Sequence, residues 1–350
     1  MYKILGVSGK GVLKERGTGQ NQIPESLSFS DREDPVERVV SYILITTNDC
    51  QNRCPHCFIS PDLKEHGFLA VGKDGKFDRA VASSVVSGFH GGSSVALSGG
   101  EFFLHPYYRE LLGEIARSGD PPRYVEIDTN MERITSVEQA SGDMLAVKGE
   151  LAGSGVRLCY AASVDDNHAY GTLGGSEGRW GALAEKARML HVAAELCGVK
   201  HYFRAALTEG QKRSGYVERI IGAVGVPRAR AGHYCGMDIL DLIENPVSRQ
   251  VELDGSLREG TTEGQAREIG MKRIWLEVAG MQDLAEGNAT VCINPNGDVL
   301  LSDHILGKKI GAVTARADLS RVITGYVKKI EGRSEGRLAE LRDELGALMR

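Results

Sequence analysis

The chain of 350 residues contains no apolar run that approaches the roughly 20 residues a membrane-spanning helix needs. Its first residues, Met-Tyr-Lys-Ile-Leu, begin no secretory signal peptide. An excess of one charge is also missing: 42 basic and 47 acidic residues leave a formal net charge of −5, so nothing attracts the chain globally to nucleic acid or to a membrane surface. We therefore expect a cytoplasmic protein that binds neither; the sequence does not predict its oligomeric state.

Internal repeats of 20–50 residues and low-complexity tracts are absent as well, apart from an alternation of short apolar segments with amphipathic ones that begins near residue 39. The predicted strands cover residues 41–47, 94–97, 124–127, 156–164, 202–207 and 226–231. The predicted helices cover residues 77–89, 106–117, 136–151, 180–196 and 216–224. Six strands that alternate with five helices imply an α/β fold with parallel strands, which should curve into a partial (β/α)6 barrel.

The rhythm changes after residue 245. Two strands, 289–293 and 299–302, are joined by Asn-Pro-Asn-Gly, which predicts a hairpin, and two helices follow at 318–330 and 334–348. The last helix has an apolar face formed by Leu338, Leu341, Leu345 and Leu348. We expect this face to pack on its own domain; a dimer contact is the alternative. The predicted organisation is an N-terminal extension (1–38), the partial barrel (39–244) and a small α+β extension (245–350).

Seven cysteines in an apparently cytosolic chain favour reduced thiols, some of them ligands, over disulfides. Cys50, Cys54 and Cys57 follow the first predicted strand within eight residues. Three thiolates on one short loop suit a soft metal centre that keeps one position open. A zinc site or buried free thiols are the alternatives; structural zinc sites usually add a fourth Cys or His, and His56 is poorly placed to serve as one.

This Cys-x3-Cys-x2-Cys pattern, with Ser98-Gly99-Gly100-Glu101 after the second predicted strand, resembles the radical S-adenosylmethionine (SAM) superfamily over residues 41–231. The resemblance implies that the three cysteines ligate one [4Fe–4S] cluster and that SAM binds the open iron through its amino and carboxylate groups. Glu101 would accept hydrogen bonds from the ammonium group. Glycine lacks a Cβ, so Gly99 and Gly100 would let the backbone approach the ligand.

The resemblance extends to other strand ends. Asp128-Thr129-Asn130 and Ser163-Val164-Asp165 are similar to the segments that meet SAM in the family, and Arg204 could face a carboxylate. Turn formation by Asp128 and Asn130, or a surface ion pair of Arg204, would explain these residues without a ligand. The residues thereby implied in cofactor binding are His56, Phe58, Ser98, Gly99, Gly100, Glu101, Asp128, Asn130, Ser163, Asp165 and Arg204.

Residues 289–299 resemble the hairpin of the SPASM and twitch extensions, which carry auxiliary clusters in some relatives. No cysteine follows Cys292, so we expect the shape of that extension without a second cluster. Cys235 follows the sixth predicted strand and could donate a hydrogen atom to a substrate radical; the alternative is a small, partly buried residue. Cys159 and Cys197 are expected in the core.

The resemblance implies an enzyme that cleaves SAM reductively to a 5′-deoxyadenosyl radical, with electrons from a flavodoxin- or ferredoxin-type donor. We expect a small natural-product-like substrate and a redox-neutral outcome, epimerisation first. Modification of a ribosomal peptide, by carbon–carbon or thioether bond formation or by dehydrogenation, is the alternative. The alternative from a different functional class is a non-catalytic iron–sulfur protein, such as an electron carrier. Electron carriers, however, usually saturate their clusters with four protein ligands.

Overall fold

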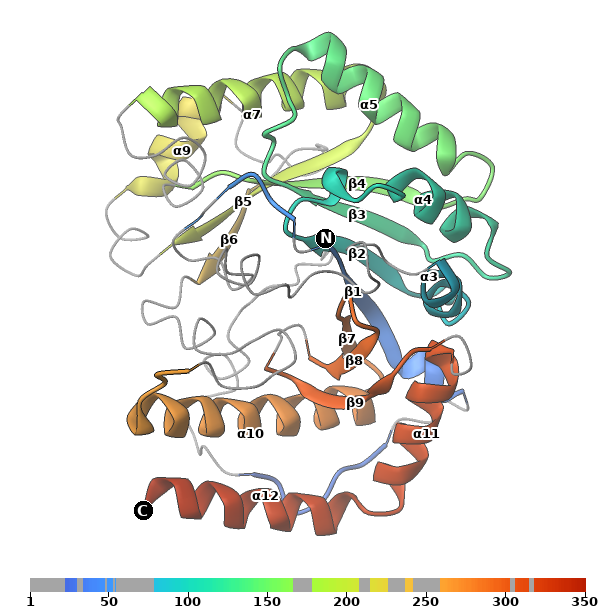
Figure 1. Cartoon of the computed structure of the whole chain (residues 1–350), viewed down its shortest axis with the longest axis vertical. Helices are drawn as coiled ribbons and strands as arrows, with labels where there is room; N and C mark the ends of the chain where they lie inside the picture. Colours follow the sequence, from blue (N-terminus) through green and yellow to red (C-terminus); the bar gives the residue numbers. More distant parts are fainter. Residues whose placement is uncertain are drawn as a thin grey trace.

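The computed structural model describes residues 23–29, 34–47, 49–52, 54, 79–165, 178–207, 215–225, 237–241, 259–302, 306–314 and 318–350. Their strands form a nine-stranded mixed sheet in the order β6-β5-β4-β3-β2-β1-β7-β8-β9. Helices follow several of the strands along the chain, and they flank the sheet (Figure 1). The chain therefore has an α/β fold.

Strands β1 to β6 are all paired in parallel with their neighbours. Their bounds are β1 (Val39–Thr47), β2 (Ser94–Gly99), β3 (Tyr124–Thr129), β4 (Arg157–Ser163), β5 (Lys200–Leu207) and β6 (Met237–Asp241). The helices in this part are η1 (Pro35–Arg38), α3 (Arg79–Val86), η2 (Phe102–Leu104), α4 (Tyr108–Arg117), α5 (Val137–Glu150), α7 (Gly178–Cys197) and α9 (Tyr216–Val224). The first five predicted strands and the five predicted helices are confirmed, with ends displaced by a few residues.

The strand at the edge of the sheet beyond β5 was not predicted. Residues 226–231 lie outside the described part of the chain, and the strand that pairs with β5 is Met237–Asp241. Cys235 also lies outside the described residues, so its position after a sixth strand stays a prediction. Because β6 runs parallel to β5, its carboxyl end at Asp241 lies at the same edge of the sheet as the carboxyl end of β5.

Side chains alternate between the two faces of the sheet. One face bears Tyr42, Leu97, Ile127 and Phe203, which are buried in the main core together with residues of α4, α5 and α7. These helices lie along one side of the sheet in Figure 1. The other face of β3 to β5 carries polar side chains beside the small residues of β4, and it includes Glu126, a buried carboxyl group.

The C-terminal part continues the same sheet. β7 (Ala289–Ile293) pairs in parallel with β1, and β8 (Asp298–Leu301) pairs antiparallel with β7, which confirms the predicted hairpin. A further strand that was not predicted, β9 (Lys308–Ala312), pairs antiparallel with β8. The segments predicted as a barrel and an extension thus share one sheet.

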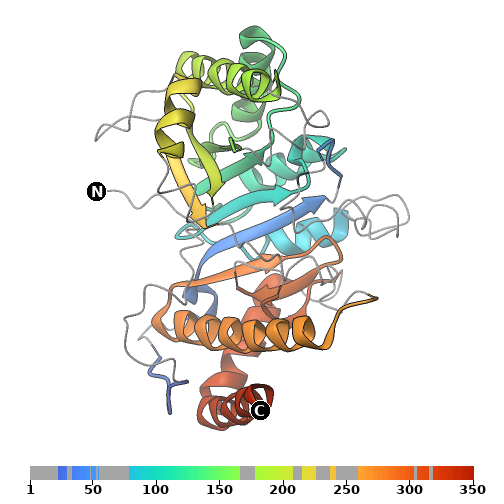
Figure 2. The ribbon, with the colours of Figure 1, turned by 90° about the vertical axis from the view of Figure 1, so that its left-hand side faces the viewer.

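Three helices accompany these strands: α10 (Glu263–Glu286), α11 (Leu319–Glu331) and α12 (Ser334–Met349). Figure 2 shows α10 beside β7 to β9 and α12 at the far end of the molecule. Helices α11 and α12 were predicted, and Leu338 and Leu341 of α12 are buried in the chain's own core, as expected. Helix α10 was not predicted. No helix in the described ranges combines the length and apolar character that crossing a membrane requires.

Candidate functional site

The cysteine loop begins where β1 ends. Cys54 is buried and Cys50 is partly exposed, and neither is in a disulfide. The backbone N–H of Asn52 donates a hydrogen bond to Cys50 Sγ at 3.3 Å. Cys57, with the predicted cofactor residues His56 and Phe58, lies outside the described residues. Two of the three predicted ligands are thus placed on one short segment at the carboxyl end of β1.

Gly99 holds the end of β2 against this segment. Its φ of +132° belongs to the region that glycine alone adopts readily, and a Cβ there would lie 2.4 Å from the carbonyl oxygen of Thr47. The next two N–H groups complete the contact: Gly100 donates to the Thr47 carbonyl and Glu101 to the Asp49 carbonyl, both at 2.7 Å. The sequence predicted that these glycines approach a ligand; the approach seen here is to the backbone that leads into the cysteine loop.

Glu101 lies beneath this contact and is 1% exposed. Its carboxylate accepts hydrogen bonds from the backbone N–H of Asn130 at 2.7 Å and from Thr129 Oγ1 at 3.1 Å. Burial raises the pKa of Glu101 to about 7, although the hydrogen bonds from Asn130, Thr129 and Phe103 oppose the rise. A carboxyl group with this pKa changes its charge readily near neutral pH when a cation approaches.

Asn130 connects the two motifs. Besides its backbone bond to Glu101, its side-chain Nδ2 donates to Cys50 Sγ at 3.3 Å. Its Oδ1 accepts from the N–H of Glu132 at 2.9 Å, so the turn-forming role considered for this residue is present as well. The end of β3 therefore contacts both the cysteine loop and the carboxylate that follows β2.

Arg204 on β5 binds carboxylates of the chain itself. Its guanidinium donates to Asp128 Oδ1 at 2.9 Å and to Glu126 Oε1 at 3.0 Å, and also to the hydroxyl of Tyr202. Burial, with the nearby Asp128, raises the pKa of Glu126 to about 7, while Arg204 opposes the rise. Arg204 thus forms ion pairs within the chain, as the explanation without a ligand proposed, but these pairs are partly buried and not at the surface.

The remaining predicted cofactor residues lie at strand ends. Ser98 and Ser163 are partly exposed, near the carboxyl ends of β2 and β4, and Asp165 is 1% exposed just after β4. In the register of β4 and β5, Ser163 is paired with Arg204. These residues therefore lie toward the edge of the sheet that holds Glu101, because the parallel strands end there together. Cys235 lies outside the described residues.

Sequence reasoning missed Glu126 and Tyr202, and it did not include Thr129 among the site residues. Glu126 could have been found, because a charged residue in an apolar strand, two positions before Asp128, indicates a polar face. The thiols predicted in the core are confirmed: Cys159 and Cys197 are buried. Cys292 is also buried, in a small cluster with Ile43, Ile45, Ala96 and Leu300.

Neither the protein-family models nor the curated protein sequences contain a match to this chain. Its function must therefore be inferred from its residues and their geometry.

Proposed function

We propose that the chain is a radical SAM enzyme in which Cys50, Cys54 and Cys57 hold one [4Fe–4S] cluster and SAM binds the open iron. One observation carries this proposal: Asn130 binds Cys50 Sγ through its side chain and Glu101 through its backbone. A thiol that accepts N–H donors and has a buried carboxylate nearby suits a cluster that shares its site with an amino-acid ligand. A purely structural zinc site has no use for that carboxylate.

The donor set fits the proposed cofactors. Hydrogen bonds to sulfur, here from the N–H of Asn52 and from Asn130 Nδ2, stabilise thiolate charge and tune the potential of iron–sulfur centres. Glu101 would accept hydrogen bonds from the ammonium group of SAM. The positive charge would favour the ionised carboxylate, so binding would release a proton from Glu101 at neutral pH.

The bound cofactors would supply a 5′-deoxyadenosyl radical once a flavodoxin- or ferredoxin-type donor delivers an electron. The chain's own task is to align the substrate and to exclude water. The polar face that holds Glu126, Asp128 and Arg204 offers carboxylates and a guanidinium to a small polar substrate, next to the end of β3 that carries Asn130.

We propose hydrogen abstraction from a small natural-product-like molecule, followed by a redox-neutral step. The predicted hydrogen-atom donor for that later step, Cys235, lies outside the described residues, so its role stays a prediction.

Anaerobic reconstitution with iron and sulfide tests the cluster. We expect about four irons per chain, an amount that Cys50→Ala and Cys54→Ala lose, because each removes a thiolate ligand. Cys159→Ala is the matched control: it removes a buried thiol from β4 and should keep the iron. Wild-type iron content in Cys50→Ala would defeat the assignment.

The reconstituted protein is then reduced in the presence of SAM, and 5′-deoxyadenosine is measured. Release of this product is expected from the wild type and not from Cys50→Ala. A protein that holds four irons but neither binds nor cleaves SAM would be a non-catalytic iron–sulfur protein, and the enzyme proposal would fail.

A further inference from the structure

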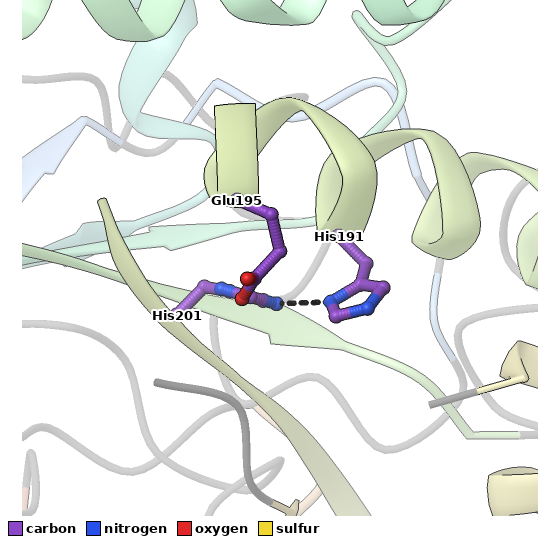
Figure 3. Close-up of side chains that lie close together, drawn as sticks. All are labelled: His191, Glu195 and His201. Carbon is purple, nitrogen blue, oxygen red and sulfur yellow. Dashed lines mark hydrogen bonds between the residues drawn. The ribbon is translucent and has the colours of Figure 1, made fainter. Parts of the chain in front are cut away.

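A second group of ligand-type side chains lies where α7 ends and β5 begins. It consists of His191 and Glu195 of α7 and His201 of β5, and Figure 3 shows the three side chains directed toward one another. One ligand atom of each lies within 4.8 Å of the others. The closest pair is His191 Nδ1 and His201 Nε2, which are hydrogen-bonded at 2.9 Å.

The local structure explains why the three side chains converge. His191 and Glu195 are four residues apart, so they are neighbours on one side of the helix. His201 is 1% exposed and lies on the face of β5 that is covered by helices. Its ring packs edge-on against Phe203, with ring centres 5.9 Å apart, which restricts its orientation.

At least one of the two rings is neutral, because the hydrogen bond between their ring nitrogens needs an acceptor lone pair. Burial, and then the neighbouring His191, lower the pKa of His201 to about 4, so its ring is neutral at physiological pH. A neutral imidazole keeps a lone pair for coordination, whereas an imidazolium has none.

We propose that His191, Glu195 and His201 form a binding site for a divalent ion of the zinc type, with water in the fourth position. Two imidazoles and a carboxylate are a known zinc ligand set, and imidazole favours zinc over magnesium or calcium. Zinc–nitrogen bonds of about 2.0–2.1 Å at tetrahedral angles separate two ring nitrogens by about 3.3 Å. The rings, now 2.9 Å apart, would need to separate by only about 0.4 Å.

Glu195 has room to complete the site. It is exposed, so its carboxylate can rotate toward the ion without disturbing the core, and water can reach the fourth position. The ion would tie the last turns of α7 to the first residues of β5. The site is separate from the cysteine loop, because His201 lies on the opposite face of β5 from Tyr202 and Arg204.

Zinc stoichiometry and affinity of the full chain test this site, with a competing chelator dye as the readout. The wild type should bind one zinc ion more than His191→Ala. Zinc on the cysteine loop, if any, is common to both proteins and cancels in the comparison. Removing a residue that only hydrogen-bonds a metal ligand already costs about 10- to 100-fold in affinity, so losing the His191 ligand itself should cost at least about 100-fold.

Two further variants keep the test independent of folding. Glu195→Gln changes an exposed side chain and should also lower the affinity of this site for zinc. Glu185→Gln, at another exposed position of α7, should leave that affinity unchanged. The cobalt(II) spectrum of the wild type minus that of Glu195→Gln should show nitrogen and oxygen ligation without thiolate charge transfer. Equal zinc stoichiometry in the wild type and His191→Ala, or unchanged affinity in Glu195→Gln, would overturn the proposal.

Discussion

Replacing Gly99 by alanine should damage the contact that holds the cysteine loop against the end of β2. The new Cβ would lie 2.4 Å from the carbonyl oxygen of Thr47, and that neighbour is backbone that cannot rotate away. The φ of +132° adds strain for any residue with a Cβ. Either the two strand ends separate or Gly99 changes its backbone conformation.

The cost can be worked out from these contacts. A residue held in a sparsely populated backbone region costs about 1–3 kcal/mol. Separation of the strand ends also weakens the hydrogen bond from the Gly100 N–H to the Thr47 carbonyl, which is 2.7 Å long, and a lost bond of this kind costs about 1 kcal/mol. Together these terms predict that Gly99→Ala lowers the free energy of unfolding by about 2–4 kcal/mol.

Urea denaturation of the two proteins, followed by circular dichroism, measures this difference. Gly142→Ala is the matched control, because Gly142 is exposed within α5 and a Cβ there would meet nothing within 4 Å. In a helix, alanine is more favourable than glycine by about 0.5–1 kcal/mol, so the control should be stabilised. The reasoning is refuted if Gly99→Ala loses less than about 0.5 kcal/mol, since the close approach would then carry no strain.

Two predictions concern pH. Because the pKa of Glu101 is raised from 4.5 to about 7, the folded state retains this proton more tightly than the unfolded state, and wild-type stability should fall by about 3 kcal/mol as the pH rises through that window. Glu101→Gln has no such proton, so its stability relative to wild type, measured by urea denaturation from pH 4.5 to 8, should rise by that amount; a constant difference would contradict the prediction. Arg204→Met should cost about 3–5 kcal/mol at pH 8, because it leaves Glu126 and Asp128 without their shared guanidinium. The cost should shrink at pH 5, where Glu126, with a pKa of about 7, is protonated; equal costs at the two pH values would show that the charge of Glu126 is not responsible.

Local patterns in the sequence predicted much of the fold. The turn Asn-Pro-Asn-Gly predicted the hairpin, and Gly297 indeed has a φ of +84° there. Helix α10 was missed, although Ile274, Val278 and Met281 recur at helical spacing and are buried in the main core. Its start did carry a readable signal: Thr262 and Gln265 form a capping box, and both residues are visible in the sequence.

The first five strands, the hairpin, the α/β class and the three cysteines of the loop could be read from the sequence, because each depends on residues that are near one another in the chain. Which side chains meet could be seen only in the folded chain. Asn130 reaches Cys50, and Arg204 reaches Glu126, across 80 and 78 residues of sequence. Such contacts depend on strand order, on register and on which face a side chain occupies, and a shift of one residue in a strand would reverse every face.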